Sequence, residues 1–259
     1  MALVLTEVDG DVGTIALNRP EKANSLSNEF LAAIVAAFDD FEADRLRAVV
    51  LRAAAGSRVW SAGHDVSDLP LDGSDPLEYK IPLEDLLRRV QSYPGPVIAM
   101  VDSGVWGGAC DLVSTCDIVI ASEQATFAMT PAKLGIAYNP SGLTHFIGVV
   151  GLHKAKEMFF SAQPLNAEEA LRVGMLNHLV PDAELESFTY RLARTITLNS
   201  PVAIRAIKEQ FRLLTRGQAL SSETFERVQS LRREAYQGAD YREGLQAFAE
   251  KRPPEFTGW

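Results

Sequence analysis

The 259-residue sequence has few cysteines, a deficit of basic residues and no long apolar run. Its two cysteines, Cys110 and Cys116, lie on an apolar stretch, which favours reduced core residues over a disulfide or a metal site. A run of about 18 apolar residues is missing, which excludes a transmembrane helix. The first residues, 1–4, lack the charged region and cleavage site of a signal peptide, so we expect a cytoplasmic protein.

The charge balance restricts the class of partner. Acidic residues outnumber basic ones by 34 to 25, which gives a net charge of −9. This balance argues against a nucleic acid as the main partner. An anionic ligand is still compatible if lysines and arginines gather around it locally. Apolar residues make up 47% of the chain, enough for the core of one large domain.

The hydrophobic pattern predicts alternating strands and helices in the first part of the chain. Strands are expected at 3–5, 12–17, 47–51, 97–101 and 117–121, the first two as a hairpin, with amphipathic helices after the loop at 19–24, before the strand at 97–101, and over 110–114. This alternation favours parallel βα units. Residues 68–82, rich in Pro, Asp and Gly, are expected to form a loop beside the site.

After residue 150 the sequence predicts only helices. Asn166 followed by Glu169 is a capping box. Ser200-Pro201 begins a helix that is expected to end at Gly217, and two more helices follow it. Their apolar faces need a partner, either the core or another subunit. We therefore divide the chain into a core, 1–199, and a helical segment, 200–259.

Two small-residue turns carry the strongest functional signal. Residues 61–65 (SAGHD) and 104–111 (GVWGGACD) each follow a predicted strand and can leave backbone N–H groups without partners. If the two turns face each other, they form an oxyanion hole, in which two donors point at one developing negative oxygen. This arrangement predicts acyl chemistry through an enolate or a tetrahedral oxyanion.

The two turns, their spacing and the helical tail resemble the crotonase superfamily, also called the enoyl-CoA hydratase/isomerase family. The resemblance implies an α/β fold, a crotonase-like spiral of ββα units with a C-terminal helical segment that builds homotrimers or hexamers. It implies an acyl-CoA thioester as the ligand. It also assigns the oxyanion hole to the backbone N–H groups of His64 and Gly108, the second at a helix N-terminus.

One difference from the hydratases concerns their two catalytic glutamates. This chain has the shorter Asp111 at the first position and Pro131 at the second. Since proline neither takes nor gives a proton, the chain lacks the carboxylate that a hydratase needs to deprotonate water. The sequence therefore argues against hydration.

Further segments resemble the methylmalonyl-CoA decarboxylases of the same superfamily: 61–69 (SAGHDVSDL), 105–109 (VWGGA), 129–131 (MTP), 134–139 (LGIAYN) and 250–252 (EKR). The resemblance implies decarboxylation of methylmalonyl-CoA, or a close malonyl-type thioester, to propionyl-CoA and CO₂. This reaction needs no metal, biotin or other cofactor. No base is needed either, because the breaking C–C bond supplies the electrons.

The resemblance also implies individual roles. The expected catalytic residues are His64, Gly108, Tyr138, Thr130 and Asp111. The expected substrate- and CoA-binding residues are Lys22, Ala23, Ala62, Gly63, Asp65, Val66, Trp106, Gly107 and Lys251, the last together with Arg252 near the CoA phosphates. No role is assigned to His145, His153 or His178.

Two alternatives stay open at this point. The first is another acyl-CoA enzyme of the same fold, such as a hydratase, an isomerase or a hydrolase, for which Asp111 is the available base. The second is a non-catalytic scaffold that binds CoA.

Overall fold

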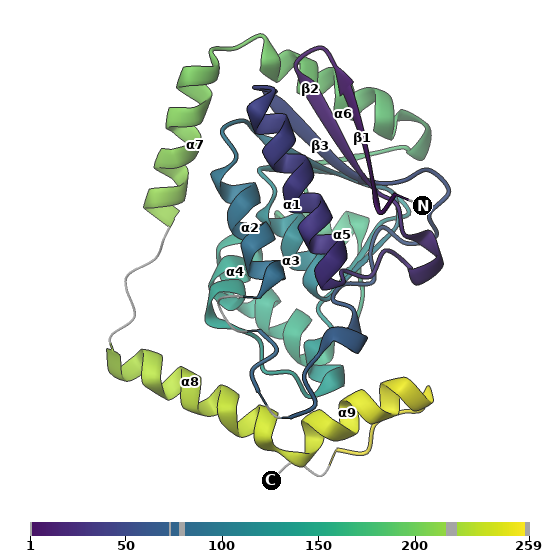
Figure 1. Cartoon of the computed structure of the whole chain (residues 1–259), viewed down its shortest axis with the longest axis vertical. Helices are drawn as coiled ribbons and strands as arrows, with labels where there is room; N and C mark the ends of the chain where they lie inside the picture. The colour runs from purple at the N-terminus through teal and green to yellow at the C-terminus, as the bar shows by residue number, and fades with distance from the viewer. Residues whose placement is uncertain (1, 73, 78–80, 216–221, 257–259) are drawn as a thin grey trace.

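The computed structural model describes residues 2–72, 74–77, 81–215 and 222–256. Within these ranges the strands and helices alternate around two sheets, and the last helices lie outside the sheets (Figure 1). None of the helices in the described ranges combines the length and the apolar character that crossing a bilayer requires.

The larger sheet has the strand order β1-β2-β3-β4-β6-β9. Its strands are β1 (Val4–Asp9), β2 (Val12–Leu17), β3 (Ala48–Ala53), β4 (Val97–Val101), β6 (Ile118–Ser122) and β9 (His178–Val180). β1 and β2 form the predicted antiparallel hairpin, and every later pair is parallel. The prediction of helices alone after residue 150 is wrong at β9 and at the two-residue strand β8 (Leu165–Asn166), because two or three residues are too few to show a strand period.

A second sheet is formed by three short strands in the order β5-β7-β8. They are β5 (Gly104–Trp106), β7 (Thr126–Ala128) and β8 (Leu165–Asn166). β5 contains the beginning of the second small-residue turn, so this sheet sets where that turn lies.

The helices confirm the predicted ones with shifted ends. The α-helices are α1 (Asn28–Ala43), α2 (Pro82–Ser92), α3 (Gly108–Thr115), α4 (Pro140–Ser161), α5 (Ala167–Arg172), α6 (Asp182–Thr197), α7 (Pro201–Thr215), α8 (Ser222–Gln237) and α9 (Ala239–Glu250); the 3-10 helices are η1 (Pro20–Lys22), η2 (Val66–Asp68) and η3 (Pro131–Leu134). The Asn166 side chain caps α5 by accepting the Glu169 N–H at 2.8 Å. The predicted end of α7 at Gly217 lies outside the described residues.

The core lies on both faces of the larger sheet, as expected for a parallel sheet. Val49 and Leu51 of β3 belong to the large apolar cluster that includes α1, α2 and α3. Val50, between them, points to the opposite face and packs in the cluster that includes α6. Two-sided burial explains why these strands are continuous apolar runs in the sequence.

The C-terminal helices lie at two separate places (Figure 1). α7 runs along one flank of the molecule, anchored by Lys208, whose Nζ donates to the Val90 and Gly95 carbonyls and to Asp117 Oδ2 at 2.7 Å. α8 and α9 lie at one end, where the Tyr236 hydroxyl donates to the Ala137 carbonyl. The hydrogen bond from Tyr236 to Ala137 places α8 and α9 next to the segment that contains Tyr138.

Candidate active site

Backbone hydrogen bonds hold the two small-residue turns side by side. Ser61 lies beside Val105 in a parallel bridge. The Ser61 carbonyl accepts the Trp106 N–H at 3.0 Å, and the Ser61 N–H donates to the Gly104 carbonyl at 3.2 Å. The turns therefore face each other, as the acyl-chemistry hypothesis requires.

Gly63 brings the two turns into contact. Its φ of +87° lies in the left-handed region that favours glycine. A Cβ atom at this position would lie 2.3 Å from the Trp106 carbonyl oxygen and 3.1 Å from the Gly108 nitrogen. Both the conformation and the space exclude any larger residue.

Two backbone N–H groups meet where the turns touch. A Cβ atom on Gly108 would lie 3.7 Å from the His64 nitrogen. Within the described part of the chain, neither the His64 nor the Gly108 N–H has an acceptor. Gly108 is the first residue of α3, where helix N–H groups are free and the helix dipole is positive. The pair can bind one anionic oxygen, so it is a candidate oxyanion hole.

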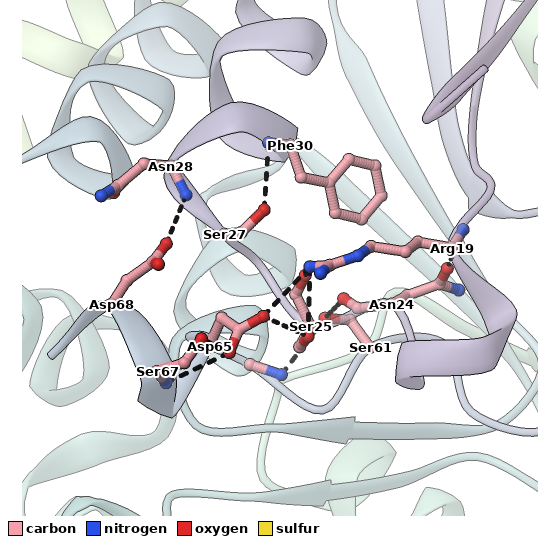
Figure 2. Close-up of polar contacts among 11 residues, drawn as sticks. Arg19, Asn24, Ser25, Ser27, Asn28, Phe30, Ser61, Asp65, Ser67 and Asp68 are labelled. Atoms are coloured by element: carbon pink, nitrogen blue, oxygen red, sulfur yellow. Dashed lines mark hydrogen bonds and ion pairs between the residues drawn. The ribbon is translucent and has the colours of Figure 1, made fainter. Parts of the chain in front are cut away.

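A polar network fixes the first turn from behind (Figure 2). Asp65 Oδ2 accepts from Arg19 at 3.1 Å and from the Ser25 hydroxyl at 3.0 Å, while Oδ1 accepts from Ser67. Partial burial opposes ionisation, but the hydrogen bonds from Ser67, Ser25 and Arg19 outweigh it and lower the pKa of Asp65. The Asp65 carboxylate therefore ties the 61–65 turn to Arg19, Ser25 and Ser67. Asn24, fully buried, accepts the Ser61 hydroxyl on its carbonyl at 2.7 Å.

A cavity of 880 Å³ opens onto the two N–H groups. Its lining is mostly apolar and includes Leu83, Leu134 and Leu245. The residues named from the sequence that line it are Lys22, Ala23, Ala62, His64, Asp65, Val66, Trp106, Gly107, Gly108, Thr130 and Tyr138. Gly63, Asp111, Lys251 and Arg252, which were also named from the sequence, are not among its lining residues.

The His64 side chain also lines the cavity. Burial lowers the pKa of its imidazole, although the nearby charges of Asp68 and Asp65 oppose this effect. Its Nδ1 is buried and has no hydrogen-bond partner among the described residues. His64 is therefore a neutral imidazole at neutral pH and can offer one hydrogen bond to a ligand.

Tyr138 joins the cavity to a buried carboxylate. Its hydroxyl donates to Asp111 Oδ2 at 2.7 Å. Burial, together with the charge and hydrogen bond of Asp111, raises the pKa of Tyr138 far above its ordinary value. The hydroxyl therefore stays protonated. Asp111 itself is 1% exposed and lies behind Tyr138.

His145, to which the sequence analysis gave no role, contacts the same carboxylate. Its Nδ1 lies 3.0 Å from Asp111 Oδ1. No pattern in the sequence indicates this contact, because a single histidine on a helix is usually a surface or core residue. Only the packing of α4 against α3 brings the two side chains together.

Glu84 of α2 is a second buried carboxyl that the sequence analysis missed. It is 6% exposed, and its Oε1 accepts from Asn139 Nδ2 at 2.6 Å. Burial and the charge of Asp111 raise the pKa of Glu84, against the effect of the Asn139 hydrogen bond. The sequence has Glu84 next to Asp85, which is exposed, and cannot tell which of the two faces inward.

Of the three cationic residues expected near the ligand, Lys22, Lys251 and Arg252, only Lys22 is among the cavity-lining residues. Arg19 and Lys133 also line the cavity. Lys251 ends α9 in a left-handed conformation, and Arg252 pairs with Glu243 and Glu250. In the part of the chain that the structure describes, no group of three or more His, Cys, Asp or Glu side chains could hold a metal ion.

The Glu84→Gln substitution is expected to stabilise the protein more at about pH 8 than at about pH 5. Because the folded-state pKa of Glu84 is raised above 4.5, the folded protein binds the extra proton more tightly. The contribution of Glu84 to the wild-type free energy of unfolding therefore falls as pH rises from about 4.5 through the folded-state pKa of Glu84. Glutamine keeps an acceptor for Asn139 and carries no charge.

Urea unfolding at both pH values measures this difference. Asp85→Asn, an exposed change in the same turn of α2, is the control and should show no comparable gain at high pH. A glutamine variant with the same advantage at both pH values would contradict a raised pKa of Glu84 in the folded protein.

Comparison with known proteins places this geometry in a family. The enoyl-CoA hydratase/isomerase family matches residues 7–259. Methylmalonyl-CoA decarboxylase of Escherichia coli (strain K12) is 43% identical over 247 residues, 95% of each chain. Short-chain-enoyl-CoA hydratase of Clostridium acetobutylicum is 31% identical over 254 residues, 97% of this chain and 96% of the relative.

Solved structures agree with these relatives. The structure of methylmalonyl-CoA decarboxylase in complex with 2-nitronate-propionyl-CoA superposes with a TM-score of 0.97 at 42% identity and covers 100% of this chain and 99% of that one. A second, with 2S-carboxypropyl CoA, gives the same TM-score, identity and coverage. The predicted α/β crotonase fold with C-terminal helices is confirmed. The chain belongs to the enoyl-CoA hydratase/isomerase family, the crotonase superfamily of acyl-CoA enzymes.

Proposed function

We propose that the protein decarboxylates methylmalonyl-CoA, or a close malonyl-type thioester, to propionyl-CoA and CO₂ without a cofactor. The observation that carries the proposal is the convergence of the free His64 and Gly108 N–H groups on a cavity whose wall has Pro131 in place of a carboxylate. The 43% identity to a methylmalonyl-CoA decarboxylase supports it.

The oxyanion hole supplies the main stabilisation in this proposal. The bond between Cα and the carboxylate breaks, and its electron pair moves into the thioester, so that charge builds on the carbonyl oxygen. The His64 and Gly108 N–H groups bind that oxygen. Loss of one such donor typically costs about 3–4 kcal/mol of barrier. CO₂ leaves, and a proton adds at Cα to complete propionyl-CoA.

Neutral groups receive the departing carboxylate. His64, Thr130 and Tyr138 line the cavity, and we assign them to hold the carboxylate perpendicular to the thioester plane. His64 and Thr130 can donate hydrogen bonds to it, whereas Tyr138, whose hydrogen goes to Asp111, provides a fixed wall. Because His64 and Tyr138 are uncharged at neutral pH, they orient the carboxylate without the full charge pairing that would stabilise the substrate. Trp106 forms an apolar wall there, which favours neutral CO₂ over the carboxylate.

The remaining lining residues are assigned to the CoA part of the substrate. Lys22, Ala23, Ala62, Val66 and Gly107 also line the cavity. Gly63 and Asp65 are assigned an indirect role, because they set the shape of the 61–65 turn against which CoA is proposed to bind. Arg19, Lys22 and Lys133 provide the local positive charge that an anionic ligand needs on an acidic protein. Lys251 is assigned to the CoA phosphates on the resemblance alone.

The alternatives fit the site less well. A hydratase or isomerase needs a base that reaches the substrate, but Pro131 has no ionisable group and Asp111 lies outside the cavity, held by Tyr138 and His145. A scaffold that only binds CoA would not need two free N–H groups beside a protonated tyrosine. It would bind acyl-CoA and release it unchanged.

A second copy of the chain is our proposal for the partner of α7. None of the α7 residues is buried, and several apolar ones are more than half exposed: Val202, Ile207, Phe211, Leu213 and Leu214. Apolar patches of this kind on a globular domain mark interaction surfaces. We propose a homotrimer or a dimer of trimers, as the family resemblance implies.

Mixing the purified protein with methylmalonyl-CoA, without added metal or biotin, should yield CO₂ and propionyl-CoA. Mass spectrometry follows both products. Tyr138→Phe should lower kcat at least about tenfold, because the ring loses the hydrogen bond to Asp111 that fixes it beside the substrate carboxylate. Tyr190→Phe, on the other face of the sheet where Tyr190 contacts Thr14, is the control. Intact methylmalonyl-CoA beside consumed crotonyl-CoA would contradict the proposal and make Asp111 the next residue to test.

Gly63→Ala should lower kcat about 10²- to 10³-fold, because the added methyl pushes the two turns apart and misplaces an oxyanion donor. Gly56→Ala is the matched control, since Gly56 has a φ of +83° and nothing within 4 Å of its Cβ position. Both variants carry similar backbone strain, and thermal unfolding of each measures it. Full turnover by the Gly63→Ala variant would contradict the role of the turns.

Light scattering after size-exclusion chromatography should give the mass of three or six chains. Phe211→Glu should shift the protein to smaller species, because a charge on the exposed face of α7 would be buried between copies. Val8→Glu, at an exposed apolar residue of β1, should leave the mass unchanged. A wild-type mass of one chain would overturn the proposed assembly.

A further inference from the structure

The direction of the Tyr138 hydroxyl depends on a carboxylate that has two partners. Asp111 Oδ2 accepts the Tyr138 hydroxyl at 2.7 Å, and Asp111 Oδ1 lies 3.0 Å from His145 Nδ1. Because an ionised carboxylate can only accept, His145 Nδ1 carries the hydrogen in this contact. Tyr138, Asp111 and His145 thus form one continuous chain of hydrogen bonds.

The three members of this chain differ in their surroundings. Tyr138 lines the cavity, Asp111 is 1% exposed, and the His145 side chain is 26% exposed and is not among the cavity-lining residues. His145 therefore does not contact a molecule bound in the cavity. Any effect of His145 on turnover must pass through Asp111.

We propose that His145 is a positioning residue, which fixes the Asp111 carboxylate and through it the hydroxyl of Tyr138. The inference rests on the proposed function, in which Tyr138 orients the substrate carboxylate. A buried carboxylate oxygen without a donor costs free energy, so Asp111 without His145 would turn toward another donor or take up water. A turn of the carboxylate removes the acceptor that holds Tyr138, and a water in place of His145 leaves the direction of the carboxylate less fixed.

The groups around Asp111 explain why the hydrogen bond from His145 matters. Glu84 is a further acidic group, close enough to Asp111 for the charge of Asp111 to raise the pKa of Glu84. Its Oε1 accepts from Asn139 Nδ2. Among the described residues, His145 is the side chain that donates to Asp111 Oδ1.

The same helix also fixes the Tyr138 ring. A Cβ atom on Gly142 of α4 would lie 2.2 Å from the ring and 3.0 Å from Asp111 Oδ2, so the helix backbone approaches both closely. Phe159, further along α4, contacts the ring with a centroid distance of 5.1 Å. α4 therefore holds the ring directly and the hydroxyl through His145 and Asp111.

A double-mutant cycle tests whether His145 acts through Tyr138. His145→Leu removes the donor and should lower kcat about tenfold with KM changed less than about twofold. In the Tyr138→Phe background, His145→Leu should cause no further loss, because no hydroxyl is left to direct. His145→Asn, whose amide nitrogen can replace Nδ1, should restore kcat to within about twofold of wild type.

The controls separate this role from general destabilisation. His153→Leu changes an exposed histidine of the same helix and should leave kcat unchanged. Thermal unfolding of every variant shows whether it is folded. Crystal structures of the two His145 variants give a readout that does not depend on turnover: the Tyr138–Asp111 hydrogen bond should persist in the His145→Asn variant and be lost in the His145→Leu variant.

Three results would overturn the inference: wild-type kcat in His145→Leu, an equal loss in both backgrounds, or an unchanged Tyr138–Asp111 hydrogen bond in the leucine variant. Absence of CO₂ release by the wild-type protein is a different failure. It would overturn the proposed function, and the crystal structures would still decide whether His145 positions Tyr138.

Discussion

The pairing of two backbone segments is the constraint on which the site depends. Ser61 and Val105 lie in a parallel bridge, and its hydrogen bonds place the turns after them within contact distance. Gly63 allows this contact, because its Cβ position would overlap the Trp106 carbonyl oxygen. The free N–H groups of His64 and Gly108 meet as a consequence. The larger sheet, α3 and the Asp65 network all serve to keep this pairing in place.

The site around these donors is kept neutral by burial. Burial lowers the pKa of His64 and raises that of Tyr138, so both are uncharged at neutral pH. The acidic groups Asp111 and Glu84 are not among the cavity-lining residues; Asp111 accepts from Tyr138 and Glu84 accepts from Asn139. Such a wall suits a reaction in which a carboxylate becomes CO₂ and negative charge moves to the thioester oxygen.

The sequence was sufficient to predict the features that depend on local pattern. Buried parallel strands are apolar runs, and glycine turns stand out in any sequence, so parallel βα units and a pair of candidate oxyanion turns could be predicted from the pattern. The crotonase fold and the donors His64 and Gly108 were implied by the family resemblance. Contacts between distant helices could not. His145 meets Asp111 only because α4 packs against α3, Glu84 differs from Asp85 only by the rotation of α2, and β9 is too short to show a period. The sequence also could not reveal that Asp111 lies behind Tyr138 rather than in the cavity.

The most direct test of the account is a crystal structure with an unreactive malonyl-CoA analogue that keeps a carbonyl at the thioester position. We predict that the carbonyl oxygen lies about 2.7–3.1 Å from both the His64 and the Gly108 nitrogen, with the carboxylate against Tyr138, Thr130 and the His64 ring. A carbonyl oxygen away from both nitrogens, or a carboxylate at the outer end of the cavity, would contradict the account.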